Sequence, residues 1–178
     1  MFQDKVVVIT GGAQGIGRCT AEEFRRNGAH VMVIDRVAGE HYVGDLADKA
    51  VLEAFADTVI ARYGRVDVLV NNAPPSFLGI DGCSYEQFQN ALAVSFAGKV
   101  RVNSISPGWI DTDYRVYEGP DAVQQPAGRV GNPLDIANMI LFLASEKAGF
   151  ITGENICIDG GQTRLMIYHG DHGWTLQP

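Results

Sequence analysis

The sequence predicts a three-layer α/β/α fold with a mostly parallel sheet. Short apolar runs rich in β-branched residues alternate with amphipathic helical patterns along the 178 residues, and this alternation is typical of parallel sheets covered on both faces. A glycine-rich turn follows the first apolar run, and an acidic residue ends the second. The length predicts a single domain, residues 1–178, in which residues 162–178 form a C-terminal tail.

The first strand, turn and helix form a candidate phosphate-binding device. Residues 5–9 (KVVVI) are the expected strand, residues 10–17 (TGGAQGIG) the turn, and residues 16–27 a helix that ends at Gly28. Glycines let the backbone approach a pyrophosphate, and the free N–H groups and dipole of the helix N-terminus attract its charge. The alternative is a tight turn whose glycines serve only the backbone.

The second strand, residues 30–34, ends in an acidic residue. Asp35 lies eighteen residues beyond Gly17, a position suited to accepting both ribose hydroxyls of an adenosine. Its charge would repel a 2′-phosphate, so the sequence favours NAD over NADP. Arg36 keeps NADP open, because an arginine can accommodate that phosphate. The alternative is an aspartate that caps a turn.

Composition excludes several classes of partner. A formal charge of −7 and a pI near 5.0 argue against nucleic acid and anionic membranes. No apolar run approaches the roughly eighteen residues that span a bilayer, and the first residues lack the pattern of a signal peptide. The three cysteines are dispersed without metal-ligand spacing, so we expect a reduced, cytoplasmic setting: Cys19, Cys83 and Cys157.

Two more strands and a helix follow. Residues 42–43 are a short third strand, residues 48–62 a helix that ends at Gly64, and residues 66–70 the fourth strand. The apolar residues of this helix are expected on one face: Val51, Leu52, Phe55, Val59 and Ile60.

These motifs resemble the short-chain dehydrogenase/reductase family, whose fold is Rossmann-like. The resemblance rests on TGGAQGIG, on Asp35, on Asp45-Leu46 after the third strand and on Asn71-Asn72-Ala73 after the fourth. It continues through residues 100–112, similar to the family's sixth strand and nicotinamide loop. Residues 129–137 resemble the last helix entry and residues 156–161 the final strand. The match covers residues 4–163 in family order.

The resemblance implies a cofactor site with no metal. The turn glycines and Ile16 would lie against the pyrophosphate and the adjoining ribose, and Asp35 would hold the adenosine ribose. Asp45 and Leu46 would flank the adenine. The implied cofactor-binding residues are Gly11, Gln14, Gly15, Ile16, Gly17, Asp35, Arg36, Asp45, Leu46, Asn72, Ala73, Pro107, Gly108, Ile110 and Thr112.

The resemblance also implies roles at the nicotinamide end. Asn72 would face the cofactor, and Asn71 would tie neighbouring strands together. The backbone of Ile110 and the side chain of Thr112 would reach the nicotinamide carboxamide. Pro74 replaces the glycine that usually follows Asn-Asn-Ala, which removes a backbone donor beside the cofactor and stiffens the turn.

The family's catalytic residues are missing. Family chemistry depends on a Tyr, a Lys four residues later and a Ser on the preceding strand, and no Tyr-x-x-x-Lys occurs in this chain. Residues 84–94 resemble the start of the crossover after the fourth strand, and residues 95–100 the end of the next crossover helix. The fold is thus shortened by about one strand–helix unit. None of the lysines at positions 5, 49, 99 and 147 has a tyrosine four residues before it; the residues there are Met1, Asp45, Ser95 and Leu143.

The shortened chain can still form a continuous crossover. Ser84 and Gln87 make a capping box for a hybrid helix over residues 85–97, and a right-handed crossover would follow. We therefore predict a six-stranded parallel sheet in which the family's sixth strand pairs directly with its fourth. The alternative is a gap filled by exchange with a second chain, because unpaired edges inside a sheet are costly.

Few other residues are candidates for chemistry, and we predict no catalytic residue. Ser95 and Lys99 have Ser-x-x-x-Lys spacing, but a helix end is a solvated place. Tyr114 and Tyr117 follow the nicotinamide loop and can be pocket or lid residues. The tail, residues 166–174, contains His-x-Asp-His between glycines, a pattern that fits a packing arm better than a metal site.

Three hypotheses remain, with the substrate left open. The first is a family member that binds NAD without hydride-transfer chemistry. The second is an active NAD-dependent oxidoreductase in which another acid substitutes, or whose molecule holds residues that the sequence omits. The third is an interaction protein that associates with full-length relatives. The apolar helix 133–145, the strand 155–159 and the tail predict at least a homodimer.

Overall fold

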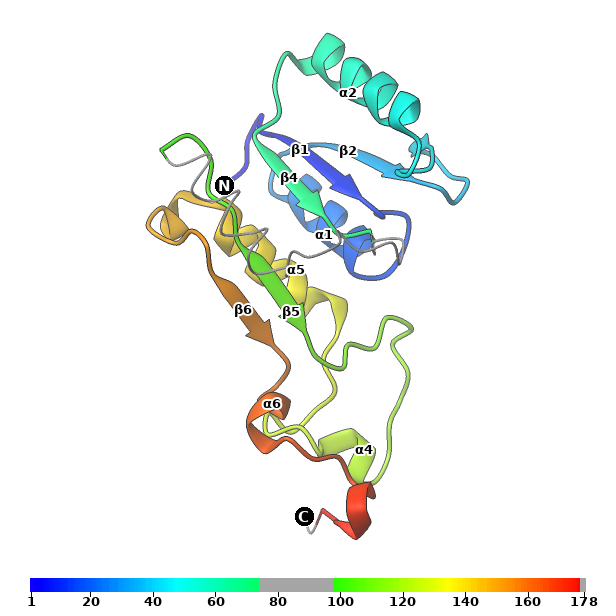
Figure 1. Ribbon diagram of the computed structural model, residues 1–178, viewed down its shortest axis with the longest axis vertical. Coiled ribbons are helices and arrows are strands. Elements are labelled where there is room, and N and C mark those ends of the chain that lie inside the picture. The colour runs from blue at the N-terminus through cyan, green and yellow to red at the C-terminus, as the bar shows by residue number, and fades with distance from the viewer. Residues whose placement is uncertain (74–97, 177–178) are drawn as a thin grey trace, which may run out of the picture. The chain divides into compact units, whose positions relative to one another are not determined.

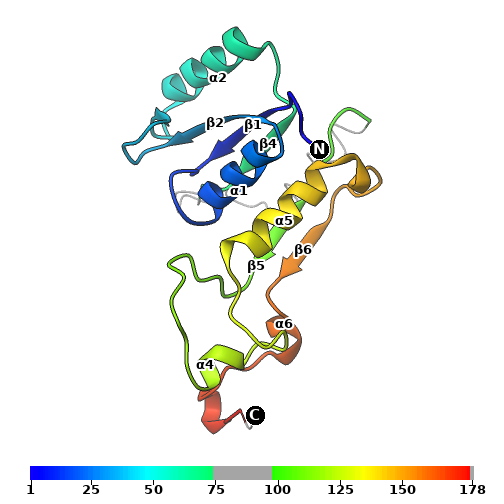
Figure 2. The ribbon, with the colours of Figure 1, turned by 180° about the vertical axis from the view of Figure 1, so that it is seen from behind.

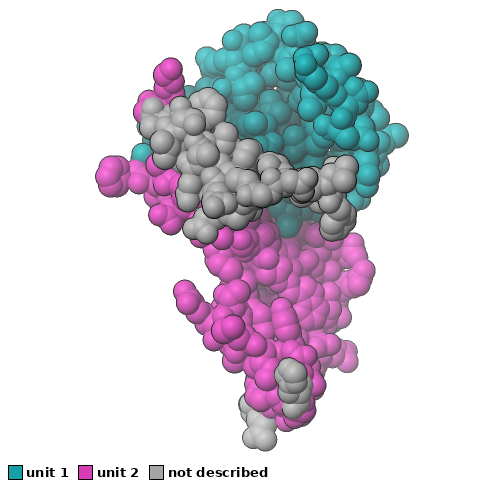
Figure 3. All heavy atoms as spheres, in the orientation of Figure 1, with its two compact units in different colours: residues 1–84, 137–149 teal, residues 85–136, 150–178 magenta. Residues whose placement is uncertain are grey.

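The computed structural model describes residues 1–73 and 98–176. The chain divides into two compact units (Figure 3). Unit 1 comprises residues 1–84 and 137–149, and unit 2 comprises residues 85–136 and 150–178. The predicted hybrid helix with its capping box, together with Pro74, Cys83 and Ser95, lies outside the described residues.

Unit 1 contains a four-stranded parallel sheet (Figure 1). The strands, each close to its predicted position, are β1 (Val6–Thr10), β2 (His30–Asp35), β3 (Tyr42–Val43) and β4 (Val68–Asn71). Their order is β3-β2-β1-β4, so the first strand lies inside the sheet. Val7 pairs with Val31 on one side and with Val68 on the other. This order brings the ends of β1, β2 and β4 together at one edge of the sheet.

The two long helices of unit 1 end where the sequence predicts. Helix α1 (Gly15–Arg26) is followed by Gly28, whose φ of +89° is easily reached only without a side chain. Helix α2 (Lys49–Tyr63) ends at Gly64, with φ +72°. The Asp48 carboxylate caps the start of α2 by accepting hydrogen bonds from two first-turn N–H groups.

The two faces of the sheet pack against different helices (Figures 1 and 2). Alternate residues of a strand point to opposite faces. Val7 and Ile9 therefore pack with Phe24 of α1 and Leu141 of helix α5 (Pro133–Ala144). On the other face the cluster of apolar side chains is Val6, Val8, Ile34, Phe55 and Val59.

One part of the predicted apolar face of α2 is wrong. Phe55 and Val59 are buried, but Leu52 is 38% and Ile60 50% exposed. Successive helical residues are about 100° apart, so the neighbours of a buried position turn toward solvent when a single sheet face is all that the helix covers. The five apolar residues therefore span a wider part of the helix surface than one face of the sheet can cover.

The connection between β2 and β3 is unusually short. These strands are parallel, with Ile34 paired to Tyr42 and Asp35 to Val43. Only residues 36–41 join them, and no helix lies in between. Parallel strands usually need a crossover of a dozen or more residues. This connection is therefore a compact turn at the carboxyl end of β2.

Unit 2 contains a two-stranded parallel sheet. Strand β5 (Ser104–Pro107) pairs with β6 (Asn155–Ile158), with Ile105 opposite Ile156. Each strand lies where the sequence predicts one. The short helices of the chain are α4 (Pro120–Val123), η1 (Glu146–Ala148), α6 (Gln162–Leu165) and η2 (Asp171–Gly173).

The predicted single six-stranded sheet is wrong for the described residues. Their strands form sheets of four and two, and the pairing of β5 with β4 is not among the strand pairs. The prediction counted strands but not the helices that cover them. A helix with its side chains is about 10–12 Å wide, roughly two strand spacings of about 4.8 Å. A deletion that removes one strand therefore does not by itself match the width of a helix to a narrower sheet.

Candidate functional site

The glycine-rich turn after β1 is packed so closely that side chains are excluded. A Cβ on Gly17 would collide with the carbonyl oxygen of Gly11 and lie 2.5 Å from Nδ2 of Asn72. A Cβ on Gly11, whose φ is +66°, would lie 2.8 Å from Cα of Ala73. Real Cβ contacts are never this short. The turn therefore presents bare backbone at the carboxyl edge of the sheet.

Helix α1 begins without a side-chain cap. Its N-cap residue, Gln14, has extended backbone and makes no capping hydrogen bond, and no acidic residue lies in the first turn. Helix α5 differs, because the side-chain oxygen Oδ1 of Asn132 accepts from the backbone N–H groups of Leu134 and Asp135. The first-turn N–H groups of α1 are therefore available to an anion, which the helix dipole also favours.

The end of β4 is tied to this turn. Nδ2 of Asn72 donates to the carbonyl oxygens of Gly11, at 2.8 Å, and Thr10, at 3.2 Å. The Thr10 hydroxyl accepts from the backbone N–H groups of Asn72 and Ala73. Asn71, to which the sequence assigned the tying role, is exposed. The side-chain tie is thus made by Asn72, and its role toward the cofactor stays a prediction.

Asp35 lies at the end of β2 beside the same turn. The residue is only 8% exposed. Its carboxylate accepts two backbone hydrogen bonds, Oδ2 from the Ala13 N–H at 2.9 Å and Oδ1 from the Val37 N–H at 3.0 Å. Burial raises the pKa of this carboxyl, but the Val37 and Ala13 hydrogen bonds and the charge of His41 outweigh it and hold the pKa below its ordinary value. Asp35 is therefore a buried anion at neutral pH.

The other residues predicted for the adenosine end surround Asp35 in sequence. Arg36 is exposed, and Asp45 is exposed with Oδ1 accepting from the Ala47 N–H at 2.9 Å. Leu46 is half-buried and packs against the cluster that contains Phe55. Unit 1 thus brings the predicted pyrophosphate, ribose and adenine residues to a common edge of its sheet.

The residues predicted for the nicotinamide end belong to unit 2. Pro107 ends β5, and the Gly108 N–H donates to the Ile158 carbonyl oxygen at 2.9 Å. A Cβ on Gly108 would lie 2.6 Å from Cα of Asp159, so the loop and the end of β6 are in close contact. Ile110 bridges to the 129–132 loop, and Thr112 is exposed.

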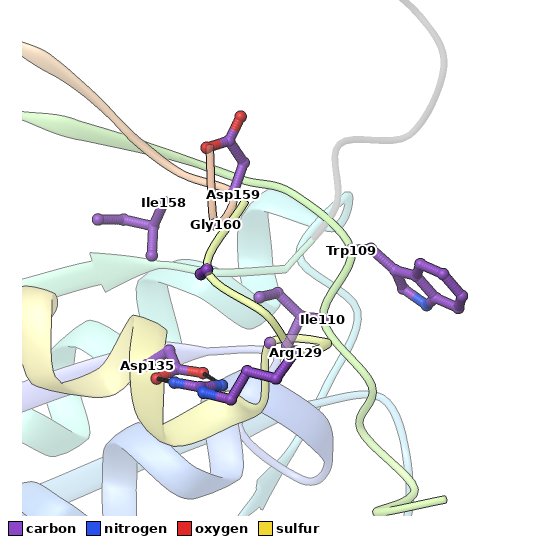
Figure 4. Close-up of a pocket in the computed structure, with 9 residues that line it drawn as sticks. Trp109, Ile110, Arg129, Asp135, Ile158, Asp159 and Gly160 are labelled. Carbon is purple, nitrogen blue, oxygen red and sulfur yellow. Dashed lines mark hydrogen bonds and ion pairs between the residues drawn. The ribbon is translucent and has the colours of Figure 1, made fainter. Parts of the chain in front are cut away.

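Unit 2 has a pocket of about 190 Å³ next to this loop (Figure 4). Ile110, Trp109 and Ile158 supply apolar surface, and the Arg129 guanidinium pairs with both Asp135 oxygens, at 2.6 and 2.8 Å. The hydrogen bonds from Arg129 lower the pKa of the Asp135 carboxyl below its ordinary value. The positive charge of Arg129 and the negative charge of Asp135 cancel, so this pair adds no net charge to the pocket.

The sequence did not predict this pocket. Arg129 and Asp135 were noted only as part of the last helix entry, and their spacing of six residues is no standard pairing pattern. The pair forms because the Asn132 side chain caps α5 while the Asp135 carboxylate accepts from the Asn132 N–H at 2.8 Å. The available signal was therefore an Asn-Pro-Leu-Asp helix start preceded by an arginine.

Of the other chemical candidates, Tyr114 and Tyr117 line a second pocket in unit 2, of about 180 Å³. Tyr114 is 69% exposed, and the Tyr117 ring packs edge-on against Trp109 at 5.1 Å between centroids. In the tail, Nδ1 of His169 accepts from the Leu176 N–H. The described residues contain no cluster of three or more His, Cys, Asp or Glu residues that could hold a metal ion.

Helix length rules out one kind of membrane segment in the part of the chain described. None of its helices is long and apolar enough to cross a bilayer. Of the cysteines there, Cys19 and Cys157 are both free thiols.

Comparison with protein families identifies the class of protein. The sequence model described as short chain dehydrogenase matches residues 5–98, and that described as enoyl-(acyl carrier protein) reductase matches residues 83–163. The chain belongs to the short-chain dehydrogenase/reductase family, a family of oxidoreductases, as its motifs and Rossmann-like fold indicate.

Individual relatives are longer than this chain. An uncharacterized oxidoreductase of Thermotoga maritima is 33% identical over an alignment of 254 positions, which spans 94% of this chain and 99% of the relative. Because the chain has only 178 residues, that alignment includes positions of the relative without a counterpart here.

Solved structures agree on the fold. The apo SCOR enzyme from Clostridium thermocellum matches with a TM-score of 0.80 and 30% identity over 99% of this chain and 100% of its own. The 3-ketoacyl-(acyl-carrier-protein) reductase from Brucella melitensis, solved with NADH, has a TM-score of 0.71 and 23% identity, covering 92% and 100% of the two chains. The second likeness concerns the fold alone.

Proposed function

We propose that this family member binds NAD(H) through unit 1 and does not catalyse hydride transfer as its complete relatives do. The observation that carries the proposal is the uncapped start of α1 beside the buried Asp35 carboxylate. An anion-binding backbone and an acceptor for ribose hydroxyls at one sheet edge are the two groups that the adenosine diphosphate half of a dinucleotide requires.

The residues present fit such a cofactor. At Gly11 and Gly17 a Cβ would strike the chain's own atoms, so these glycines let the turn pack closely against Asn72 and Ala73, and the uncapped α1 N–H groups beside it offer donors to a pyrophosphate. Asp35 has spare acceptor capacity, because an ionised carboxylate offers about four lone-pair sites and the Ala13 and Val37 N–H groups take one on each oxygen. A bound nicotinamide cofactor would supply the hydride-carrying group, and the chain supplies binding and orientation.

Preference for NAD over NADP follows from the charge of Asp35. The Val37 and Ala13 hydrogen bonds help to hold the pKa of this carboxyl below its ordinary value, so it is ionised at neutral pH and a 2′-phosphate placed there would meet like charge. Arg36 is exposed beside it and is the residue through which NADP would bind if that repulsion were overcome. The Brucella melitensis reductase, solved with NADH, has the same fold.

Loss of catalysis follows from the sequence. No lysine has a tyrosine four positions before it, and the strand that supplies the family's serine has no counterpart. Removing a positioned acid/base alone lowers rates by about 10²–10⁴, and the lysine's contact with the cofactor is lost with it. The alignment length of the Thermotoga maritima relative agrees with an internal deletion.

Titration of NADH fluorescence tests the binding proposal, after an intact mass has verified the 178 residues. We expect NADH to bind more tightly than NADPH. Asp35→Asn keeps one acceptor but removes the charge. It should weaken NADH binding by about tenfold and reduce the difference in affinity between NADH and NADPH. Equal or tighter binding of NADPH by the unaltered protein would refute the role of Asp35, and absence of NADH binding would refute the function.

We also propose that the chain forms a homodimer through its C-terminal region, in a cytoplasmic setting. Phe150 is fully exposed, Met166 is 84% and Tyr168 42% exposed, and β6 pairs only with β5 among the described strands. A second copy would cover such apolar surface by the commonest symmetry. Light scattering should report a dimer for the intact chain and a monomer for a chain ending at Gly161. A monomeric intact chain would contradict the dimer.

A further inference from the structure

We propose that His41 is a positioning residue that sets cofactor selectivity by holding the turn of residues 36–41 against Asp35. The inference rests on the proposed NAD(H) binding and names a segment that sets the affinity and selectivity of that binding. It concerns a residue that neither the glycine-rich motif nor the family's nucleotide-binding pattern singles out.

The turn needs an internal support because it has no helix. Residues 36–41 join two parallel strands directly, although such a connection normally contains a helix that packs on the sheet. The Asp35 carboxylate provides one support by accepting the Val37 N–H at 3.0 Å, the geometry of an Asx-turn. That same oxygen lies where the ribose is proposed to bind, so the shape of the turn and the site depend on each other.

His41 provides the second support. Its Nε2 lies 2.8 Å from the Val37 carbonyl oxygen, and since a carbonyl only accepts, Nε2 carries the proton and donates. Val37 therefore makes two hydrogen bonds. Its backbone N–H donates to the Asp35 carboxylate, and its carbonyl oxygen accepts from the His41 ring. The ring closes the turn immediately before β3 begins at Tyr42.

Gly39 makes room for this ring. A Cβ at position 39 would lie 2.5 Å from Cε1 and 2.8 Å from Nδ1 of His41. The φ of Gly39 is not in the left-handed region, so conformation does not demand a glycine here. A Cβ there would instead push the imidazole ring away from its hydrogen bond with the Val37 carbonyl oxygen. Gly39 and His41 are therefore a matched pair within the turn.

The consequence concerns the ribose. With His41 in place, the Val37 N–H is held on one side of Oδ1 of Asp35. Without it, the turn can swing away from Asp35, and the exposed Arg36 moves with it. NADH should then lose its ribose acceptor geometry, while a 2′-phosphate would meet a freer arginine. Loss of His41 thus reduces selectivity as well as affinity.

The test measures NADH and NADPH dissociation constants for substitutions in the turn. His41→Phe keeps a ring but loses the donor. We expect NADH to bind about tenfold more weakly, and the dissociation constant for NADPH divided by that for NADH to become smaller. His41→Gln retains a side-chain donor and should stay within about threefold of the unaltered protein. Glu40→Gln, an exposed neighbour in the same turn, is the control and should change neither constant.

A double-substitution cycle tests the pairing of Gly39 with His41. Gly39→Ala should displace the ring and reproduce the loss seen with His41→Phe. In a His41→Ala background the same change should cost little, because the ring it would strike is gone. Circular dichroism establishes that each variant is folded; should His41→Phe unfold, the Gln variant and the cycle decide.

The outcomes separate the two proposals. If the unaltered chain binds NADH and His41→Phe keeps its affinity and its selectivity, the role of His41 is refuted while NAD(H) binding stands. Additive effects of Gly39→Ala and His41→Ala refute the pairing. If the unaltered chain binds neither nucleotide, the proposed function fails and the inference fails with it.

Discussion

The two units bury different kinds of side chain. In unit 1 both faces of the sheet are covered by apolar clusters that include Phe24, Phe55 and Ile9. In unit 2 the buried side chains are largely polar, and Gln125, only 2% exposed, has no hydrogen-bond partner for either side-chain atom among the described residues. A buried polar group without a partner costs about 1–3 kcal/mol. Unit 1 therefore has an apolar core of its own, whereas unit 2 buries polar groups at a cost in stability.

This difference maps onto the two ends of the cofactor. The residues proposed for the adenosine end belong to unit 1, where Gly17 is fixed by close backbone contacts and Asp35 by hydrogen bonds. The nicotinamide residues belong to unit 2, and the segment that would carry the catalytic residues is missing from the sequence. On the proposed function, the half that binds the nucleotide is kept while the half that would perform the chemistry is lost.

The largest expected effect is the absence of turnover. We expect no measurable oxidation of alcohols or reduction of ketones, at least about 10²–10⁴ below a complete family member, because no positioned Tyr and Lys are present. A broad substrate panel with NAD and NADH measures this. Turnover that disappears in Tyr114→Phe would show that unit 2 retains a catalytic acid.

The second prediction breaks the cradle in unit 1. Gly17→Ala should weaken NADH binding by more than about tenfold and lower stability by about 1–3 kcal/mol, because the new Cβ meets the Gly11 carbonyl and Asn72. Fluorescence titration and urea unfolding measure the two effects. Gly64→Ala is the control: its Cβ would meet nothing within 4 Å, so only the strain of a positive φ should appear. Unchanged NADH affinity in Gly17→Ala would remove the turn from the site.

The third prediction tests the support of the sheet in unit 1. The Asp67 carboxylate accepts from the Val6 N–H at 2.7 Å and from Arg65 at 2.9 Å, so Asp67→Ala should cost about 2 kcal/mol. The exposed Asp57 on α2 provides a control, and Asp57→Ala should cost less than about 0.5 kcal/mol. Equal losses for the two variants would contradict the assignment.

The same carboxylate predicts an acid dependence. Burial raises the pKa of Asp67, but the Val6 and Arg65 hydrogen bonds prevail and lower it below its ordinary value. The stability it contributes is present above the unfolded pKa of about 3.9 and is lost as the pH falls through the lower folded pKa. Urea unfolding of the unaltered protein and Asp67→Ala should therefore converge in acid.

The smallest effect is expected in unit 2. Arg129 is 55% exposed at its side chain although it pairs with Asp135, and exposed ion pairs contribute about 0–1 kcal/mol. Asp135→Asn should therefore lower stability by no more than about 1 kcal/mol, as measured by urea unfolding. A loss as large as that of Asp67→Ala would mean that unit 2 is held together by this pair.

The sequence predicted most of unit 1 because its signals are local. β-Branched runs, the glycine-rich turn, Gly28 and Gly64 each act within a few residues, and the structure has them near their predicted positions. It did not predict the division into two sheets, which depends on helix widths across the whole fold.

Two features of the site also escaped sequence reasoning. The Arg129–Asp135 pair and the His41–Gly39 contact each require knowledge of how a loop closes in space. Neither has a periodic or motif signal. The side-chain tie at the end of β4 was assigned to Asn71 although Asn72 makes it, because adjacent residues of a strand end cannot be told apart without the strand's register.

The central claim is that the adenosine end of the site is intact and the nicotinamide end contributes little. Competition of ADP-ribose with NADH tests it directly, because ADP-ribose has the adenosine, the pyrophosphate and the second ribose but no nicotinamide. We predict dissociation constants for the two ligands within about threefold of each other, a difference below about 0.7 kcal/mol. NADH binding more than about tenfold tighter than ADP-ribose would show a working nicotinamide end and would contradict the account.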